Sequence, residues 1–315
     1  MNGLEISQAY FEEFGRAVLE KDFPDLLPYL AVGLVGKGSE RFGFDDEISR
    51  DHDFEPGFCL FLPGEDIVSR RQAFLLERAY AKLPKEFAGI ARQTISPVGG
   101  NRTGVIRTAD FYTETVGSPD GNLSMEAWLS IPDGALAEAV NGKVFFDHYG
   151  EFSAIREKIQ NMPEGIRLKR LAGQVWVMAQ SGQYNYLRCL RHGEEEAAQH
   201  ACQEFTEAAM KAFFLLSRKY MPYYKWSFRA LRRLENGESL AQDLSFILME
   251  DHRDRSLAEQ KEQRIEQVAS FIIDLLQKEG ITKAICTDLE KHAYSINDHI
   301  SDSHLRNLHL LASIQ

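Results

Sequence analysis

The sequence contains few cysteines and no long apolar run, and both absences narrow the class of protein. Its four cysteines, Cys59, Cys189, Cys202 and Cys286, lie far apart, with no Cys-x-x-Cys pair and no close Cys/His pairing. This spacing predicts reduced thiols and gives no zinc site. The longest apolar stretches, such as Ala212-Phe-Phe-Leu-Leu216, are far shorter than the roughly 20 residues that cross a bilayer. Since no basic segment precedes an apolar block near the N-terminus, we expect a cytoplasmic protein with no membrane partner.

Positive charge and most familiar enzyme motifs are scarce as well. The chain has 36 Lys and Arg against 47 Asp and Glu, a formal net charge of −11. Because Lys and Arg contacts to phosphates supply most of the affinity for nucleic acids, this balance argues against a nucleic-acid partner. A local basic groove is still compatible with an acidic chain. There is no Gly-x-Ser-x-Gly elbow, Walker loop, His-Glu-x-x-His motif or dinucleotide fingerprint, so those enzyme classes are not indicated.

What the sequence does contain is the pair Gly38-Ser39, followed a short distance downstream by Asp51-His-Asp53. The apolar run from Tyr29 to Val35 predicts a buried strand before the pair. A strand that leads into Gly-Ser and then a short helix aims backbone N–H groups and a hydroxyl at one point, which suits phosphate oxygens. On a second expected strand, the two aspartates share one face, where a cation such as Mg²⁺ would relieve their repulsion. A turn and a solvated strand start explain each half alone, but the combination favours a phosphate and metal site.

This segment resembles the signature of the nucleotidyltransferase superfamily, which includes the polymerase-beta-like minimal nucleotidyltransferases and the aminoglycoside nucleotidyltransferases. The signature consists of an apolar residue and Gly-Ser, then a helix, then Asp-x-Asp on a strand. More narrowly, residues 38–53 are similar to a bacterial family known only as domain of unknown function 4037. That family also has counterparts of Trp128-Leu-Ser-Ile-Pro132, Gly142 to Asp147 and Arg218 to Trp226. The resemblance extends from about residue 30 to about residue 240 and brings no known substrate.

The resemblance implies a reaction and a set of residues for it. The reaction is transfer of a nucleoside monophosphate, AMP first among them, from an NTP to a hydroxyl of a small-molecule acceptor, with release of pyrophosphate. Asp51 and Asp53 would be catalytic and would bind Mg²⁺, or Mn²⁺ in its place. Gly38 and Ser39 would bind phosphate oxygens, and Arg50 would be a further nucleotide contact.

The expected fold class is α+β, with a small mixed-sheet nucleotidyltransferase domain at residues 1–162 and an all-α helical bundle domain at residues 163–315. Helical periodicity dominates the second part, where Pro222 is the one proline after Pro163, and short connections favour antiparallel helices. The segments expected to be helical there are Leu168 to Tyr186, Glu194 to Tyr220, Lys225 to Leu234, Leu240 to Met249, Leu257 to Lys278 and Ser303 to Leu311.

The resemblance also implies a third carboxylate, which would complete the metal site or act as the base, and this residue has no unmistakable motif. The stretch from Gly104 to Val116 has the β-rich composition of a strand. Asp110 on this stretch is the first candidate, followed by Glu114, and Glu126 is a further one. A solvated surface carboxylate is the alternative explanation for each of them.

The densest cluster of aromatic and basic residues follows a proline in the second part. Pro222 interrupts a helix, and Tyr223, Lys225 and Trp226 come directly after it. They are candidates for nucleotide binding, since aromatic faces can stack on a base and an ammonium can bind a triphosphate. Aromatic residues beside a proline kink can also simply fill an interface between helices.

Two other classes of protein remain open. One is a nucleotide-binding pseudoenzyme or sensor, which binds ATP and Mg²⁺ without releasing pyrophosphate. The other is a toxin–antitoxin-like protein that acts on a macromolecular partner. The sequence does not decide the oligomeric state between a monomer and a homodimer.

Overall fold

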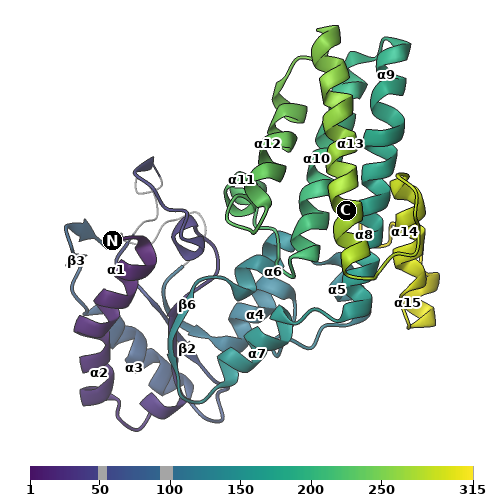
Figure 1. Ribbon diagram of the computed structural model, residues 1–315. Coiled ribbons are helices and arrows are strands. Elements are labelled where there is room, and N and C mark those ends of the chain that lie inside the picture. The colour runs from purple at the N-terminus through teal and green to yellow at the C-terminus, as the bar shows by residue number, and fades with distance from the viewer. Residues whose placement is uncertain (49–54, 93–101, 315) are drawn as a thin grey trace. The chain divides into compact units, whose positions relative to one another are not determined.

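The structure is a computed structural model and describes residues 1–48, 55–92 and 102–314 (Figure 1). The chain forms two compact units, each described here by itself. The first comprises Met1–Leu123 and Ala135–Asn161, and the second comprises Ser124–Gly134 and Met162–Gln315. The sequence assigned residues 124–134 to the first part. They pack with the second unit because the buried Arg170 donates hydrogen bonds to the carbonyls of Trp128 and Ile131 and to Asp133.

The first unit is built on a four-stranded mixed sheet with the order β5-β2-β1-β6. The central strand β1 pairs antiparallel with both β2 and β6, and β2 pairs parallel with β5. Every residue of β1 and β2 is buried, as expected for central strands covered on both faces. The strands are β1 (Ala31–Leu34), β2 (Cys59–Leu62), β5 (Gly104–Arg107) and β6 (Lys143–Asp147), and β3 (Glu86–Phe87) and β4 (Ile90–Ala91) form a separate hairpin.

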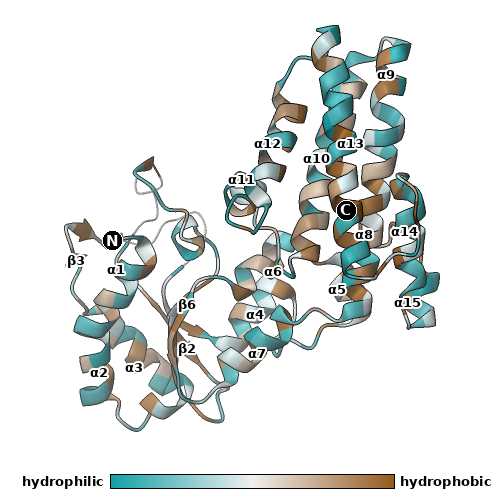
Figure 2. Ribbon diagram, in the orientation of Figure 1, coloured by the Kyte–Doolittle hydropathy of each residue, from teal (hydrophilic) through white to brown (hydrophobic). Residues whose placement is uncertain are grey.

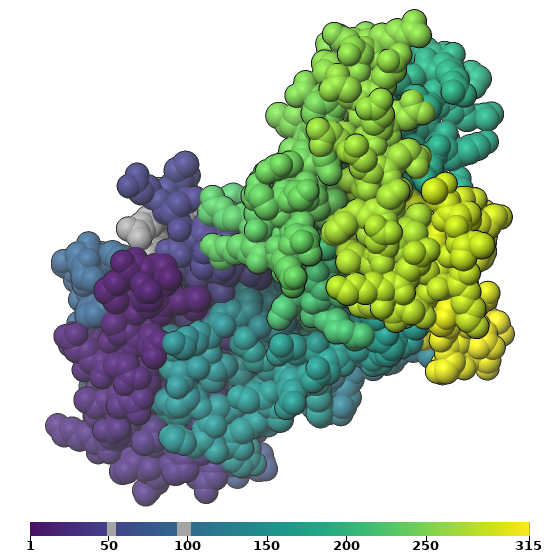
Figure 3. Space-filling view, viewed as in Figure 1, coloured from purple at the N-terminus to yellow at the C-terminus, as the bar shows by residue number. Residues whose placement is uncertain are grey.

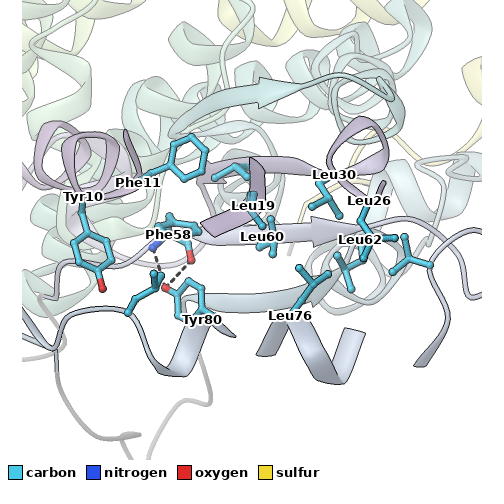
Figure 4. Packing of buried hydrophobic residues seen from close by; sticks show 13 residues of the cluster. Tyr10, Phe11, Leu19, Leu26, Leu30, Phe58, Leu60, Leu62, Leu76 and Tyr80 are labelled. Carbon is cyan, nitrogen blue, oxygen red and sulfur yellow. Dashed lines mark hydrogen bonds between the residues drawn. The ribbon is translucent and has the colours of Figure 1, made fainter. Parts of the chain in front are cut away.

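Helices of the first unit cover the sheet and supply its core. Side chains from α1, α2 and α3 meet those of β2, and the Tyr80 hydroxyl donates to the Phe58 carbonyl at 2.9 Å and accepts from its N–H at 3.1 Å (Figure 4). Full burial of each large apolar side chain contributes about 1.5–3 kcal/mol. The helices are α1 (Gly3–Tyr10), a π-helical turn (Phe11–Gly15), α2 (Arg16–Asp22), α3 (Arg70–Ala81), α4 (Thr108–Val116), α6 (Asp133–Val140, which begins in the second unit) and α7 (Glu151–Gln160).

The second unit is helical throughout its regular elements. In Figure 2 its long helices carry both apolar and polar residues, and the buried residues of α10 and α13 are mostly apolar. The C-terminal residues, yellow in Figure 3, cover part of its surface beside α13. Its helices are α5 (Met125–Ser130), α8 (Glu164–Met178), a π-helical segment (Ala179–Tyr186), α9 (Leu187–His192), α10 (Glu195–Leu216), α11 (Tyr224–Leu231), α12 (Gly237–Met249), α13 (Arg255–Lys278), α14 (Leu289–Asp298) and α15 (Ser303–Asn307).

The expected α+β class is confirmed, with one clear local correction. The stretch from Gly104 to Val116 is a strand only as far as Arg107, and α4 follows from Thr108. Thr108, Tyr112 and Val116 are all buried at helical spacing, so packing of this face outweighs the β-branched composition. Within the described residues, no helix combines the length and the apolar character needed to cross a bilayer.

Candidate functional site

The loop that follows β1 contains the Gly-Ser pair and has a backbone that only glycine accepts. Gly38 has φ 134° and ψ 145°, and a Cβ there would lie within 3 Å of the Glu40 and Arg41 side chains. The helix expected after Gly-Ser is a single 3₁₀ turn, Ser39–Phe42, which ends at Gly43 with φ 64°. A long helix dipole therefore does not contribute at this point, and any phosphate would be bound by the loop itself.

A buried arginine underlies this loop. The side chain of Arg41 is 2% exposed, although surface exposure is the rule for arginine. Its Nε donates to the Val35 carbonyl at 2.8 Å, its Nη2 donates to the Arg102 carbonyl at 2.6 Å, and its Nη1 pairs with the Glu40 carboxylate. Arg41 thus joins the end of β1 to the residues just before β5, and its ion pair with Glu40 lies beside Gly38.

An asparagine from the other end of the unit fixes the start of the same loop. The Asn141 side-chain amide accepts from the Gly36 N–H at 2.8 Å and donates to the Gly36 carbonyl at 2.7 Å, as a neighbouring strand would. The next residue, Gly142, approaches so closely that a Cβ would lie 1.9 Å from the Leu34 carbonyl oxygen. The loop is therefore held from both sides. Among the described residues, the hydroxyl of Ser39 has no hydrogen-bond partner of its own.

The predicted metal ligands Asp51 and Asp53, and the predicted nucleotide contact Arg50, lie outside the described residues. The chain that follows them is firmly held from Glu55 onward. The Glu55 carboxylate accepts from the Thr103 hydroxyl at 2.5 Å, and the Gly57 carbonyl accepts from the Ser7 hydroxyl at 2.6 Å.

All three candidates for a further carboxylate are exposed, and of these Glu114 pairs with the loop residue Lys37. Asp110 is exposed in the first turn of α4, on a helix and not on the predicted strand. Glu114 is 78% exposed and makes a surface ion pair with Lys37 at 3.3 Å. Glu126 lies on α5 in the second unit, where hydrogen bonds to its own backbone N–H and to Ser124 lower the pKa of its carboxyl.

A carboxylate that the sequence did not single out, Glu138, faces the loop charges. Burial raises the pKa of the Glu138 carboxyl, and the positive charges of Lys37, Arg41 and Arg102 oppose that rise. Glu138 lies in the last turn of α6, and Asn141 directly follows the end of that helix at Val140. Its sequence signal is weak, because it is a lone acid in the alanine-rich run Ala135-Leu-Ala-Glu-Ala139.

The predicted nucleotide-binding residues of the second part lie at the start of α11. Tyr223 is 55% exposed. The Lys225 ammonium lies 5.1 Å from the centroid of the Trp226 ring, and the guanidinium of Arg229 lies 5.0 Å from the same ring. These residues belong to the second unit, whereas Gly38 and Ser39 belong to the first. The interface-filling alternative does not fit Tyr223, which is exposed.

Comparison with known families gives one match. Residues 128–227 match the model of a family described as domain of unknown function (DUF4037). This confirms the resemblance to that family over a range that includes Trp128, Glu138 and Lys225. The range begins after Gly38 and Asp53, so the match does not bear on the nucleotidyltransferase superfamily. No curated protein and no solved structure matches the chain.

Proposed function

We propose that this protein is a metal-dependent nucleotidyltransferase that moves AMP from ATP to a hydroxyl of an acceptor and releases pyrophosphate. The observation that carries the proposal is the loop after β1. Gly36 and Gly38 both have positive φ values of 98° and 134°, Asn141 and Arg41 fix the two sides, and the Ser39 hydroxyl is left to a ligand. Such a loop can present backbone N–H groups to phosphate oxygens without reorganising.

The residues that would hold a metal fit Mg²⁺ by their chemistry. Asp51 and Asp53 supply hard carboxylate oxygens, and Mg²⁺ is usually held by one or two carboxylates together with substrate phosphates. When bound, the metal would neutralise the triphosphate and polarise the α-phosphate.

The remaining steps fall to the chain itself. Gly38 and Ser39 would bind the phosphates that leave as pyrophosphate. Positioning and charge complementarity would then provide most of the rate enhancement, as in other phosphoryl transfer reactions. Glu138 would accept the proton of the acceptor hydroxyl, because a carboxyl with a raised pKa is a better base near neutral pH. Cytoplasmic localisation remains part of the same proposal.

Release of pyrophosphate by the full chain tests this function directly. The protein is incubated with Mg²⁺, each of the four NTPs and pools of hydroxylated small molecules. We expect release with ATP, loss of release in EDTA, and a fall of about two orders of magnitude or more for Asp51→Asn and Asp53→Asn. Asp25→Asn, which removes an exposed carboxylate before β1 in the same unit, is the matched control and should retain activity. If the protein binds ATP but releases no pyrophosphate with any acceptor, it is instead a pseudoenzyme.

Two glycine variants test the loop independently of the aspartates. Gly38→Ala places a Cβ within 3 Å of two side chains at a φ of 134°, so the loop must move and we expect the KM for ATP to rise by about tenfold or more. Gly117→Ala also changes a glycine of positive φ, 75°, but its Cβ meets no atom within 4 Å. It should cost about 1 kcal/mol of stability and leave the KM unchanged. Equal KM values for the two variants would remove the loop from the proposal.

The choice of base has its own comparison. Glu138→Gln should lower kcat strongly, whereas Asp110→Asn should have little effect because Asp110 is exposed. The wild-type rate should fall as the pH drops through the raised pKa of Glu138, since the protonated carboxyl cannot accept a proton. The opposite ranking of the two variants would return the role to Asp110.

A further inference from the structure

Positive charge is concentrated in one stretch of this otherwise acidic chain. Residues 208–234 contain seven Lys and Arg and no Asp or Glu, whereas the whole chain has a net charge of −11. The stretch forms the end of α10, the loop that follows it and α11. Its basic residues are Lys211, Arg218, Lys219, Lys225, Arg229, Arg232 and Arg233.

A second acid-free stretch in the same unit shows that such bases need not face solvent. Residues 165–193 contain five Lys and Arg and no Asp or Glu. Three of them, Arg167, Lys169 and Arg170, are only 3%, 0% and 6% exposed. They donate hydrogen bonds to carbonyls and side chains within the unit. Their charge therefore serves the fold, and composition alone does not mark a binding surface.

The bases of residues 208–234 are placed differently. Six of the seven are exposed. Carboxylates pair with Lys211, Arg218 and Arg232, the last at 3.7 Å. Lys219 and Lys225 have no carboxylate partner anywhere in the described parts of the chain. Positive charge on these two side chains is thus presented to solvent without a neutralising neighbour.

Exposed aromatic rings lie among these bases. Tyr223 and Tyr224 are 55% and 74% exposed, and their ring centroids are 4.3 Å apart. Two cations lie near the Trp226 ring, Lys225 at 5.1 Å and Arg229 at 5.0 Å from its centroid. Clustered exposed rings of this size are uncommon on a surface that has no partner.

We propose that this basic aromatic surface, formed by Lys219, Tyr223, Tyr224, Lys225, Trp226 and Arg229, binds single-stranded nucleic acid. The ammonium and guanidinium groups would bind successive phosphates, and the exposed tyrosines would stack on unpaired bases. Base stacking of this kind is worth about 1–3 kcal/mol per base and tolerates any sequence. RNA and DNA offer the same phosphates and base faces, so both are tested.

The net charge of the chain does not oppose this binding at physiological salt. Interactions between exposed charges are screened beyond a Debye length of about 8 Å. Acidic residues farther away than that contribute little to the field at Lys219 or Lys225. The overall composition disfavoured a nucleic-acid partner because it counted every charge of the chain. Most of those charges are too far from Lys219 and Lys225 to affect binding there.

Fluorescence anisotropy with labelled oligonucleotides tests the surface in the full chain. The ligands are oligo(U), oligo(dT) and a duplex of equal length, without NTP or Mg²⁺, over a series of salt concentrations. The variant Lys219→Glu/Lys225→Glu should weaken single-strand binding at least tenfold and reduce the slope of log K against log salt by about 1.4, since each lost phosphate contact removes about 0.7. The variant Tyr223→Ala/Tyr224→Ala should weaken binding and leave that slope unchanged.

A matched charge reversal at another exposed site is the control. Arg253→Glu/Arg255→Glu changes the net charge by the same amount, at side chains that are 70% and 93% exposed. It should bind nearly as the wild type does. Four outcomes would each overturn the proposal. They are equal weakening by both charge reversals, equal binding of the duplex, equal binding of vesicles containing phosphatidylserine, and no binding at low salt. Thermal unfolding shows whether each variant folds. If Lys219→Glu/Lys225→Glu does not fold, Lys219→Gln/Lys225→Gln takes its place.

The experiment separates this surface from the proposed catalysis. Binding of oligonucleotides with no pyrophosphate release under any condition would refute the nucleotidyltransferase and leave the surface intact. Pyrophosphate release with a small-molecule acceptor and no oligonucleotide binding would do the reverse. If the protein both binds oligonucleotides and releases pyrophosphate, α-labelled ATP tests whether the bound strand is the acceptor. Transfer of the label to the 3′ end of the strand would show that it is.

Discussion

Two lysines of the helical unit are equally buried, yet only one of them has partners. Lys169 on α8 and Lys261 on α13 both have 0% exposure. The Lys169 Nζ donates to the Asn297 side chain at 2.9 Å and to the carbonyls of Arg306 and Leu308 at 3.3 and 2.7 Å. The Lys261 Nζ makes no hydrogen bond within the described residues. A buried lysine therefore stabilises the fold at position 169 and destabilises it at position 261.

The surroundings of the two lysines explain the difference. The partners of Lys169 are the Asn297 side chain in the last turn of α14 and two carbonyls at the end of α15, where a helix leaves its last carbonyls without intrahelical partners. Lys261 instead interacts only electrostatically with the Cys202 thiol and with the carboxylates of Asp251 and Glu250, without a hydrogen bond to any of them in the described chain. It also lies near His252, whose Nδ1 has no partner in the described chain. Burial lowers the pKa of both lysines. A buried cation is tolerable when hydrogen bonds replace its hydration, and costly when they do not.

The largest expected effect is the loss of the bonded lysine. Lys169→Met removes all three hydrogen bonds and leaves three acceptors without this donor, so we expect a destabilisation of about 3 kcal/mol or more. Urea unfolding measures the change, and limited proteolysis should release the segment after α14 first. Lys291→Met, at an exposed lysine of α14, should stay within about 0.5 kcal/mol of the wild type. Equal effects at the two sites would mean that the bonds of Lys169 carry no net stability.

The opposite sign is expected at the other lysine. Lys261→Met replaces an unpaired buried amine by an apolar side chain of similar length, and we expect a stabilisation of about 1–2 kcal/mol. Urea unfolding again measures the change. A destabilisation similar to that of Lys169→Met would show that Lys261 has a favourable role, and the comparison between the two sites would fail.

The sequence predicts a helix or strand well where its apolar residues follow one clear periodicity. The helix expected from Leu257 to Lys278 runs from Arg255 to Lys278 in the structure, because its apolar residues recur at helical spacing. Residues Thr108 to Val116 were expected to be a strand, since threonine and valine favour strands, and α4 forms because its buried face packs as a helix. The helix α14 was not predicted, although Asp288 caps it.

The candidate site divides in the same way. Gly38 and Ser39 were recognisable because a backbone motif is local in sequence. Glu138 and Asn141 were not, because Asn141 meets Gly36 across 105 residues of chain and no local pattern encodes such a contact. Burial of Arg41 is likewise a property of the folded unit, and the sequence Gly-Ser-Glu-Arg gives no sign of it. Long-range contacts of this kind decide which charges face the loop.

The smallest expected effect is a change with pH in the free energy by which buried Lys261 destabilises the fold. Because the pKa of Lys261 is lowered in the folded protein, the unfolded chain binds its proton more tightly. Stability therefore rises with pH between the lowered pKa and the ordinary value of about 10.4, and the full penalty is present below that range. The advantage of Lys261→Met over the wild type should thus shrink from pH 7 to pH 9.5, by an amount on the order of 1 kcal/mol or less.

Paired unfolding curves at the two pH values measure this change, because the thiols and tyrosines that titrate nearby are common to both proteins. Lys291→Met should keep a constant difference from the wild type over the same range. An advantage of Lys261→Met that stays constant would mean that Lys261 keeps its proton in the folded protein up to pH 9.5. In that case the cost of its burial would be that of a cation, and it could not be relieved by release of a proton.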